Sequence, residues 1–209
     1  MKYSEILKLN QQNINKKNHD EYKIFFLSNI IVNTINEIFE YLLGKNGINA
    51  NIKFSNYNNV IQESIDVSKY DLVIVFWEFN NLFESFQYTI ESKKNNKLLD
   101  INLKIKKDID YLLNNLKNCP LIILNKFTNN QFYFNSLMHT KGEEFCEDLN
   151  NYLINKNNNN LVLIDLNKIF LSTGIDQSID KRFYYSFQSL YTTKFYYRYC
   201  EFILPYILS

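Results

Sequence analysis

Apolar residues along the chain gather in short continuous runs that alternate with longer stretches of helical spacing. The runs with the fewest polar interruptions are 71–77, 121–125 and 161–165, and weaker runs lie at 22–27 and 50–54. Short apolar runs of this kind are typical of parallel strands that helices cover on both faces. The pattern therefore predicts an α/β fold, a three-layer sandwich with about five parallel strands.

Helical spacing of apolar residues predicts the elements between the strands. The clearest case runs from Leu98 to Leu116, where leucine and isoleucine residues fall on one helical face. No linker or repeat interrupts the pattern, so we interpret 1–209 as a single domain. The other predicted segments are a leading polar helix within 1–20, a helix directly after Ser28 and Asn29, a weak helical or loop segment at 58–67, a helix at 141–154 and an aromatic helix at 191–207.

Composition and charge narrow the classes of function. The 23 lysine and arginine residues balance 22 acidic ones, so the net charge of +1 gives no reason to expect a nucleic acid or a membrane surface as partner. No apolar run is long enough to cross a bilayer. Cys119, Cys146 and Cys200 are too few and too widely spaced for a disulfide framework or a zinc site. We therefore expect a cytoplasmic protein without a metal ion or a cofactor.

Polar residues stand at the ends of the predicted strands. In an open parallel sheet these carboxyl ends face one edge, where ligands and catalytic groups collect. We therefore expect a site at this edge. Its candidate residues are Ser28 and Asn29 after the first strand, Trp77, Glu78 and Asn80 after the third, and Asn125 after the fourth.

Ser28 allows two interpretations. Serine and asparagine are favoured N-caps, so in one interpretation the hydroxyl only accepts a hydrogen bond from a free amide of the following helix. Alternatively, the hydroxyl is a nucleophile at the sheet edge. The two roles are compatible, and the sequence leaves both open.

Four short motifs resemble those of one family. The segments 24–29, 76–79, 165–167 and 180–185 resemble the SGNH-like amino-terminal domain of FkbH-like proteins, a biosynthetic group of HAD subfamily IIIC. The resemblance covers about residues 22 to 205 and implies an SGNH-hydrolase-like or flavodoxin-like sheet. It also implies an acyl carrier protein or a HAD-type phosphatase domain as partner, in natural-product or surface-polysaccharide biosynthesis. In some members a glyceryl unit is loaded onto the carrier.

Departures from the family patterns concern the chemistry directly. The DxDxT signature of HAD phosphatases is absent, so that activity cannot be carried over. True SGNH hydrolases carry three motifs, GDS, GxND and DxxH. Residues 27–29 occupy the position of the GDS motif and keep a serine. The segment 77–80 stands near GxND without its glycine. Residues 180–183 have the spacing of DxxH, with Phe183 in place of the histidine.

A phenyl ring cannot take a proton from Ser28, which therefore keeps a high pKa and poor nucleophilicity. Of the two histidines, His19 precedes the first strand. His139 follows the fourth strand on the correct edge and is the alternative base, against its interpretation as a surface loop residue.

Other candidates also have two interpretations each. Trp77 and Glu78 both stand where they could line a pocket. The alternative for Trp77 is that it anchors the packing of the core. Asp180 and Arg182 form either an internal ion pair, which we favour, or an anion clamp. The three cysteines are interpreted as structural.

The residues leave three classes of function. The first is a catalytically impaired SGNH-like domain that binds a carrier protein, a partner domain or an acylated or glyceryl intermediate. The alternative is an active SGNH-type esterase or acyltransferase that uses Ser28. A nucleotide-binding flavodoxin-like module lacks support, because no glycine-rich loop follows the first strand.

Overall fold

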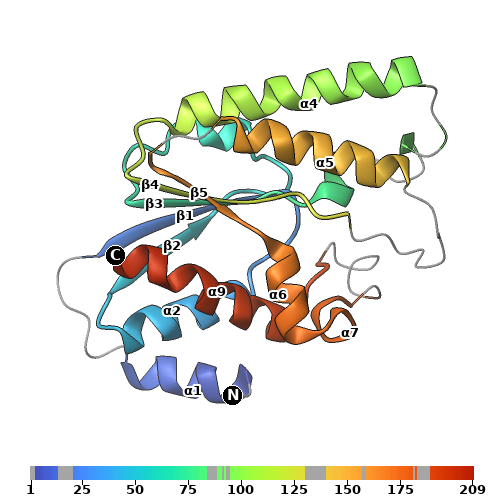
Figure 1. Ribbon diagram of the computed structural model, residues 1–209. Helices are drawn as coiled ribbons and strands as arrows, with labels where there is room; N and C mark the ends of the chain where they lie inside the picture. Colours follow the sequence, from blue (N-terminus) through green and yellow to red (C-terminus); the bar gives the residue numbers. More distant parts are fainter. Residues whose placement is uncertain are drawn as a thin grey trace.

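The computed structural model describes residues 3–13, 21–83, 89–90, 92, 95–129, 140–156, 159–180, 182 and 189–209. Its centre is one sheet of five parallel strands in the order β2-β1-β3-β4-β5, with helices on both faces (Figure 1). The predicted α/β sandwich is therefore confirmed. The strands are β1 (Tyr22–Ser28), β2 (Ala50–Phe54), β3 (Leu72–Phe76), β4 (Leu121–Asn125) and β5 (Leu161–Ile164).

The helices form two layers. In Figure 1, α4 and α5 lie above the sheet, and α2, α9 and α1 lie below it. Among the described residues, none of the helices has both the length and the apolar character needed to cross a bilayer. The helices are α1 (Tyr3–Asn13), α2 (Ile35–Lys45), α4 (Asn95–Leu116), α5 (Lys141–Ile154), α6 (Leu166–Thr173), α7 (Ile175–Ser178) and α9 (Thr193–Leu208), with short 3₁₀ turns η2 (Gln62–Ser64) and η3 (Phe79–Asn81).

Several helix boundaries differ from the expectation. The leading helix is present as α1, whereas 14–20 lies outside the described residues. The weak segment at 58–67 contains only the 3₁₀ turn η2. The helices α6 and α7 were not predicted, because their short apolar segments follow the last strand without a clear period.

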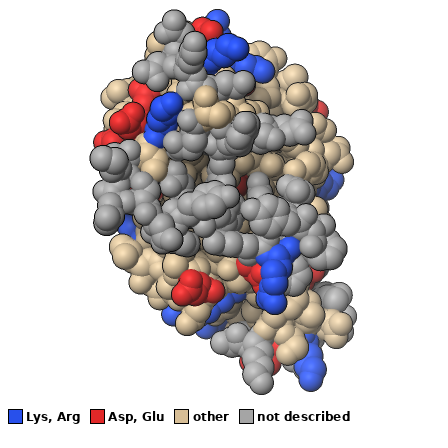
Figure 2. Space-filling view, turned by 90° about the vertical axis from the view of Figure 1, so that its right-hand side faces the viewer, with Lys and Arg blue, Asp and Glu red and all other residues tan. Residues whose placement is uncertain are grey.

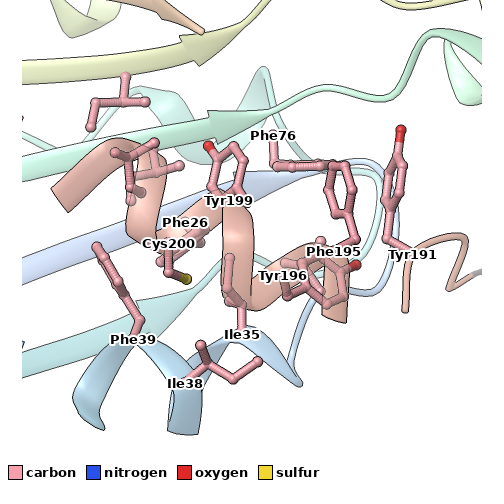
Figure 3. Packing of buried hydrophobic residues seen from close by; sticks show 14 of the residues in the cluster. Phe26, Ile35, Ile38, Phe39, Phe76, Tyr191, Phe195, Tyr196, Tyr199 and Cys200 are labelled. Atoms are coloured by element: carbon pink, nitrogen blue, oxygen red, sulfur yellow. The ribbon is translucent and has the colours of Figure 1, made fainter. Parts of the chain in front are cut away.

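Most of the described aromatic residues near the C-terminus pack in the core. Phe76 of β3 lies at the centre of a ring cluster, with centroids of Tyr191, Tyr196 and Tyr199 at 5.5, 6.3 and 5.2 Å. Figure 3 shows these rings between β3 and the helices α2 and α9. The cluster fixes the start of α9 against the carboxyl end of β3, and this contact brings Tyr191 to the sheet edge.

The strand order sets the place of the site. From β1 the chain reaches β2 on one side and β3 on the other, so β1 and β3 flank the point where the order reverses. Ser28 pairs with Phe76 in register, so both strands end at the same level. In sheets of this order, ligands bind at the carboxyl ends beside such a switch point.

Candidate functional site

Asn29 joins the loop after β1 to the loop after β3. Its side chain is fully buried; Oδ1 accepts a hydrogen bond from the Glu78 N–H at 2.6 Å, and Nδ2 donates to the carbonyl oxygens of Glu78 and Asn81, both at 2.9 Å. The Asn81 side chain in turn donates to the Asn29 carbonyl. An amide side chain offers the same donor and acceptor as a peptide group. Asn29 therefore continues the pairing of β1 with β3 beyond the end of the strand.

Asn125, the last residue of β4, holds the segment after β3 from the other side. Its Oδ1 accepts from the Trp77 N–H at 2.7 Å and its Nδ2 donates to the Trp77 carbonyl at 3.1 Å. Backbone groups of consecutive residues in an extended chain face opposite neighbours. Trp77 is therefore held from β4 and Glu78 from β1, and the extended segment after β3 is fixed on both sides.

A third asparagine, which the sequence did not single out, holds the next loop. Asn150 of α5 accepts from the Phe127 N–H at 2.8 Å and donates to the Phe127 carbonyl at 2.9 Å. The abundance of asparagine in the chain hid this role, because nothing local distinguishes Asn150 from its neighbours.

The Glu78 carboxyl lies at the centre of the edge and is only 1% exposed. The Tyr191 hydroxyl donates to its Oε2 at 2.5 Å, and the Asn80 side chain donates to its Oε1 at 3.1 Å. Burial raises the pKa of Glu78 to about 7, although the hydrogen bonds from Tyr191 and Asn80 act in the opposite direction. The carboxyl therefore changes its charge near neutral pH.

Tyr191 reaches this position through a short antiparallel contact. Ile179 and Tyr191 form a bridge, flanked by a hydrogen bond from the Asp180 N–H to the Leu190 carbonyl at 3.0 Å. The Tyr191 ring stacks on Phe195 with 4.2 Å between centroids. Figure 3 shows its hydroxyl pointing away from Phe195. The sequence pattern predicts Tyr191 at the start of the aromatic helix and gives no sign of its bond to Glu78.

Ser28 is not the N-cap of a helix. The helix α2 begins at Ile35 with Thr34 at the cap position, so the expectation of a helix directly after β1 was wrong. The Ser28 hydroxyl instead donates to the Ile30 carbonyl at 2.9 Å and accepts from the Ile30 N–H at 3.2 Å. This local turn engages the hydroxyl at both its donor and its acceptor, and the side chain is only 5% exposed.

The register of the GDS motif also argues against Ser28 as the nucleophile. When 27–29 is read against GDS letter by letter, Ser28 takes the place of the aspartate and Asn29 the place of the serine. An amide has no nucleophilic oxygen comparable with a serine hydroxyl. His139 and Phe183 lie outside the described residues, so their roles stay predictions.

Asp180 and Arg182 form the favoured ion pair. Arg182 Nη2 lies 2.9 Å and Nε 3.2 Å from the two Asp180 carboxylate oxygens, and the Arg182 backbone N–H donates to Oδ1 at 3.0 Å. The arginine side chain is 89% exposed, so solvent screens the pair. A role of this pair in ligand binding stays a prediction.

Trp77 is mostly buried and serves as a packing anchor. Its ring lies 5.9 Å from that of Phe127, within the core under α4 and α5. Two polar atoms beside this core have no hydrogen-bond partner, Thr128 Oγ1 and Asn129 Nδ2. Both belong to the loop after β4, next to the candidate site.

The three cysteines are buried, which agrees with their interpretation as structural. All three are free and buried, and burial raises the pKa of Cys146 to about 12. Within the described part of the chain, no group of three or more His, Cys, Asp or Glu side chains is placed to hold a metal ion.

The outer surface of this edge carries charges of both signs. Figure 2 views the molecule from the right-hand side of Figure 1, and the basic and acidic residues it shows are interspersed around the periphery. The described surface on this side therefore shows no extended basic face of the kind that binds nucleic acid.

Comparison with known proteins identifies structures that share this fold. No protein family model matches the chain, and no curated protein matches it either. Among solved structures, the N-terminal part of the protein BF1531 from Bacteroides fragilis, which contains a phosphatase domain, has a TM-score of 0.74 at 12% identity. The match covers 100% of this chain and 57% of that one, so this chain spans little more than half of the BF1531 fragment.

Lipases share the fold more distantly. The lipase Lip_vut3 from a goat rumen metagenome has a TM-score of 0.59 at 11% identity, over 88% of this chain and 96% of that one. A GDSL-like lipase from Bacteroides thetaiotaomicron has a TM-score of 0.52 at 12% identity, over 99% and 98%. At these identities the similarity concerns the fold alone. The chain has the SGNH-like α/β fold that GDSL-like lipases and the N-terminal part of BF1531 share.

Proposed function

We propose that this chain is an SGNH-like binding domain without hydrolase activity, which works with a HAD-type phosphatase domain as FkbH-like proteins do. The observation that carries the proposal concerns the hydrogen bonds of Ser28, the last residue of β1, and of Asn29, which follows it. The Ser28 hydroxyl is bonded to both backbone groups of Ile30, and a buried amide stands at the third position of the motif. A serine that donates its proton to a carbonyl is not activated for attack.

The partner domain is supported by the similarity to the N-terminal part of BF1531. That structure contains a phosphatase domain, and this chain covers 57% of it. The resemblance of the motifs at 24–29 and 180–185 to FkbH-like proteins agrees with such a pairing. The domain then presents an acylated intermediate on an acyl carrier protein, at the carboxyl edge of the sheet, to the phosphatase domain.

The setting we propose is a biosynthetic pathway for a natural product or a surface polysaccharide, in the cytoplasm. The three free cysteines agree with a reducing compartment.

An ester-hydrolysis assay tests the absence of catalysis. Hydrolysis of p-nitrophenyl acetate and butyrate by the wild type should equal that of Ser28→Ala, and both should equal the rate without enzyme. A wild-type rate a hundredfold above that of Ser28→Ala would replace the proposal by the alternative, an active esterase or acyltransferase.

Binding to the partners is tested separately. A purified HAD-type phosphatase domain of an FkbH-like protein and a carrier protein with its pantetheine arm are titrated against the chain by calorimetry. Saturable binding of either one supports the proposal. Absence of binding to both, together with an inactive Ser28, would contradict it.

A further inference from the structure

The Glu78 carboxyl is surrounded by hydrogen-bond donors, and none of the described residues supplies a cation to it. Its donors are the neutral groups of Tyr191 and Asn80, and no ion pair involving Glu78 occurs in the described part of the chain. A buried carboxylate without a cation is costly, and hydrogen bonds to neutral donors offset only part of that cost. Among the described residues, the charged state of Glu78 is therefore not balanced by a positive charge.

The loop after β4 holds polar groups that lack partners of their own. Thr128 is 7% exposed, and neither its Oγ1 nor Asn129 Nδ2 has a hydrogen-bond partner among the described residues. Buried polar groups are normally paired, and exceptions call for an explanation. An acceptor oxygen supplied by a ligand would satisfy both groups, because a hydroxyl and an amide N–H are donors.

The two sets of groups lie beside one another. The rings of Phe79 and Phe127, next to Glu78 and Thr128 in sequence, are 6.0 Å apart. Cys146 of α5 joins the two loops, because the Asn129 backbone bonds to its thiol and Glu78 is close enough to raise the pKa of that thiol. The Glu78 carboxyl and the unpartnered atoms of Thr128 and Asn129 therefore belong to one region of the sheet edge.

We infer that this edge binds an acyl group with a free primary amine, whose ammonium pairs with Glu78 and whose carbonyl oxygen accepts from Thr128 and Asn129. The inference rests on the proposed function, because it names the class of acyl group that the binding domain receives. An ammonium fits better than a hydroxyl for a physical reason. A hydroxyl adds one more neutral donor and leaves the buried charge uncompensated, whereas an ammonium neutralises it.

Among the described residues, the titratable groups near Glu78 do not change their charge between pH 6 and 8, so Glu78 sets the pH dependence that we expect. Tyr191 precedes α9, Tyr196 lies in α9 and Cys146 lies in α5. Burial raises the pKa of Tyr196 far above its ordinary value and that of Cys146 to about 12, so both stay neutral between pH 6 and 8. Since the pKa of Glu78 is about 7, its carboxylate fraction falls about tenfold from pH 8 to pH 6.

Two matched probes test the inference. The first, 3-aminopropanamide, carries an ammonium that stays charged at both pH values, and 3-hydroxypropanamide replaces it by a hydroxyl of similar size. Both are titrated into ¹⁵N-labelled full chain, and dissociation constants are read from amide chemical shifts. We expect the amine to bind at least tenfold more tightly than the hydroxyl probe at pH 8, and about tenfold more weakly at pH 6 than at pH 8.

Two variants test the contacts to the ammonium and to the carbonyl oxygen separately. Glu78→Gln keeps the shape and should abolish the preference for the amine. Thr128→Val removes a hydroxyl without a partner, so the fold should be unaffected, and both probes should bind several-fold more weakly. Equal affinity of the two probes, no saturable shift with the amine, or an amine preference that survives in Glu78→Gln would each overturn the inference.

A failure of the amine inference can be distinguished from a failure of the proposed function. If the carrier protein or the phosphatase domain binds the chain but the amine shows no preference, the binding domain stands and the amine class is wrong. If Ser28-dependent hydrolysis is found, the proposed function itself falls.

Discussion

The Tyr191 hydroxyl donates a hydrogen bond of 2.5 Å to Glu78 Oε2 across 113 residues of sequence. This bond ties the segment before α9 to the loop after β3, and both partners are buried. The same two residues control the electrostatics of the sheet edge, because the tyrosine partly compensates a carboxyl that burial disfavours.

Tyr191→Phe removes this donor and should lower the free energy of unfolding by about 1.5–3 kcal/mol at pH 8, the range for a hydrogen bond to a charged group. The ring and its stacking on Phe195 are kept, so the loss reports the hydroxyl alone. Urea denaturation followed by circular dichroism measures the difference.

Tyr199→Phe is the matched control in the same aromatic cluster. Its hydroxyl is fully buried without a hydrogen-bond partner. Removing an unpaired buried polar group should leave the stability unchanged or raise it by about 1 kcal/mol. Equal destabilisation by the two changes would show that the bond to Glu78 is not the cause.

The stability should depend on pH through Glu78. Folding raises the pKa of this carboxyl from 4.5 to about 7, so the folded state binds more protons than the unfolded state between these values. The free energy of unfolding should therefore fall as the pH rises from 4.5 to 7, by about 3 kcal/mol, and should level off above pH 7.

Glu78→Gln should remove this decrease, because a neutral amide replaces the titrating carboxyl. The control is Glu147→Gln at an exposed position of α5, which should leave the pH profile parallel to that of the wild type. Urea denaturation at half-unit steps from pH 4.5 to 8.5 gives the profiles. An unchanged slope in Glu78→Gln would assign the pH dependence to other groups.

Asn125→Asp tests the amide that holds Trp77. The aspartate keeps an acceptor for the Trp77 N–H but loses the donor to the Trp77 carbonyl, and it places a second carboxylate in the core. We expect a loss of about 3 kcal/mol at pH 7, since a buried group is left unpaired and a charge is desolvated. Asn118→Asp, at an exposed position after α4, should stay within about 0.5 kcal/mol of the wild type.

The sequence predicts the sheet better than the site. Apolar runs such as 71–77 locate the strands within one or two residues, because burial on both faces leaves an unbroken pattern. The strand ends likewise predict Asn29, Glu78 and Asn125 at one edge. Tyr191 escapes prediction, because its role depends on a bridge to Ile179 and on the depth at which α9 packs.

The local structure at Ser28 shows a second limit. A serine at a strand end before apolar residues of helical spacing favours a cap, and the same residue also stabilises a tight turn. The six residues from Asn29 to Thr34 separate the strand from α2, and no periodic signal marks them.

Ser28→Ala should destabilise the protein and leave ester hydrolysis at the rate without enzyme. The change removes a hydroxyl that donates to the Ile30 carbonyl and accepts from the Ile30 N–H, and both backbone groups become unpaired in a buried turn. We expect the free energy of unfolding to fall by about 1–2 kcal/mol in urea denaturation. Ser172→Ala, which deletes an exposed hydroxyl on α6, should change it by less than about 0.5 kcal/mol. If Ser28→Ala is as stable as the wild type, the hydroxyl is not needed for the turn, and its freedom to act as a nucleophile would have to be considered again.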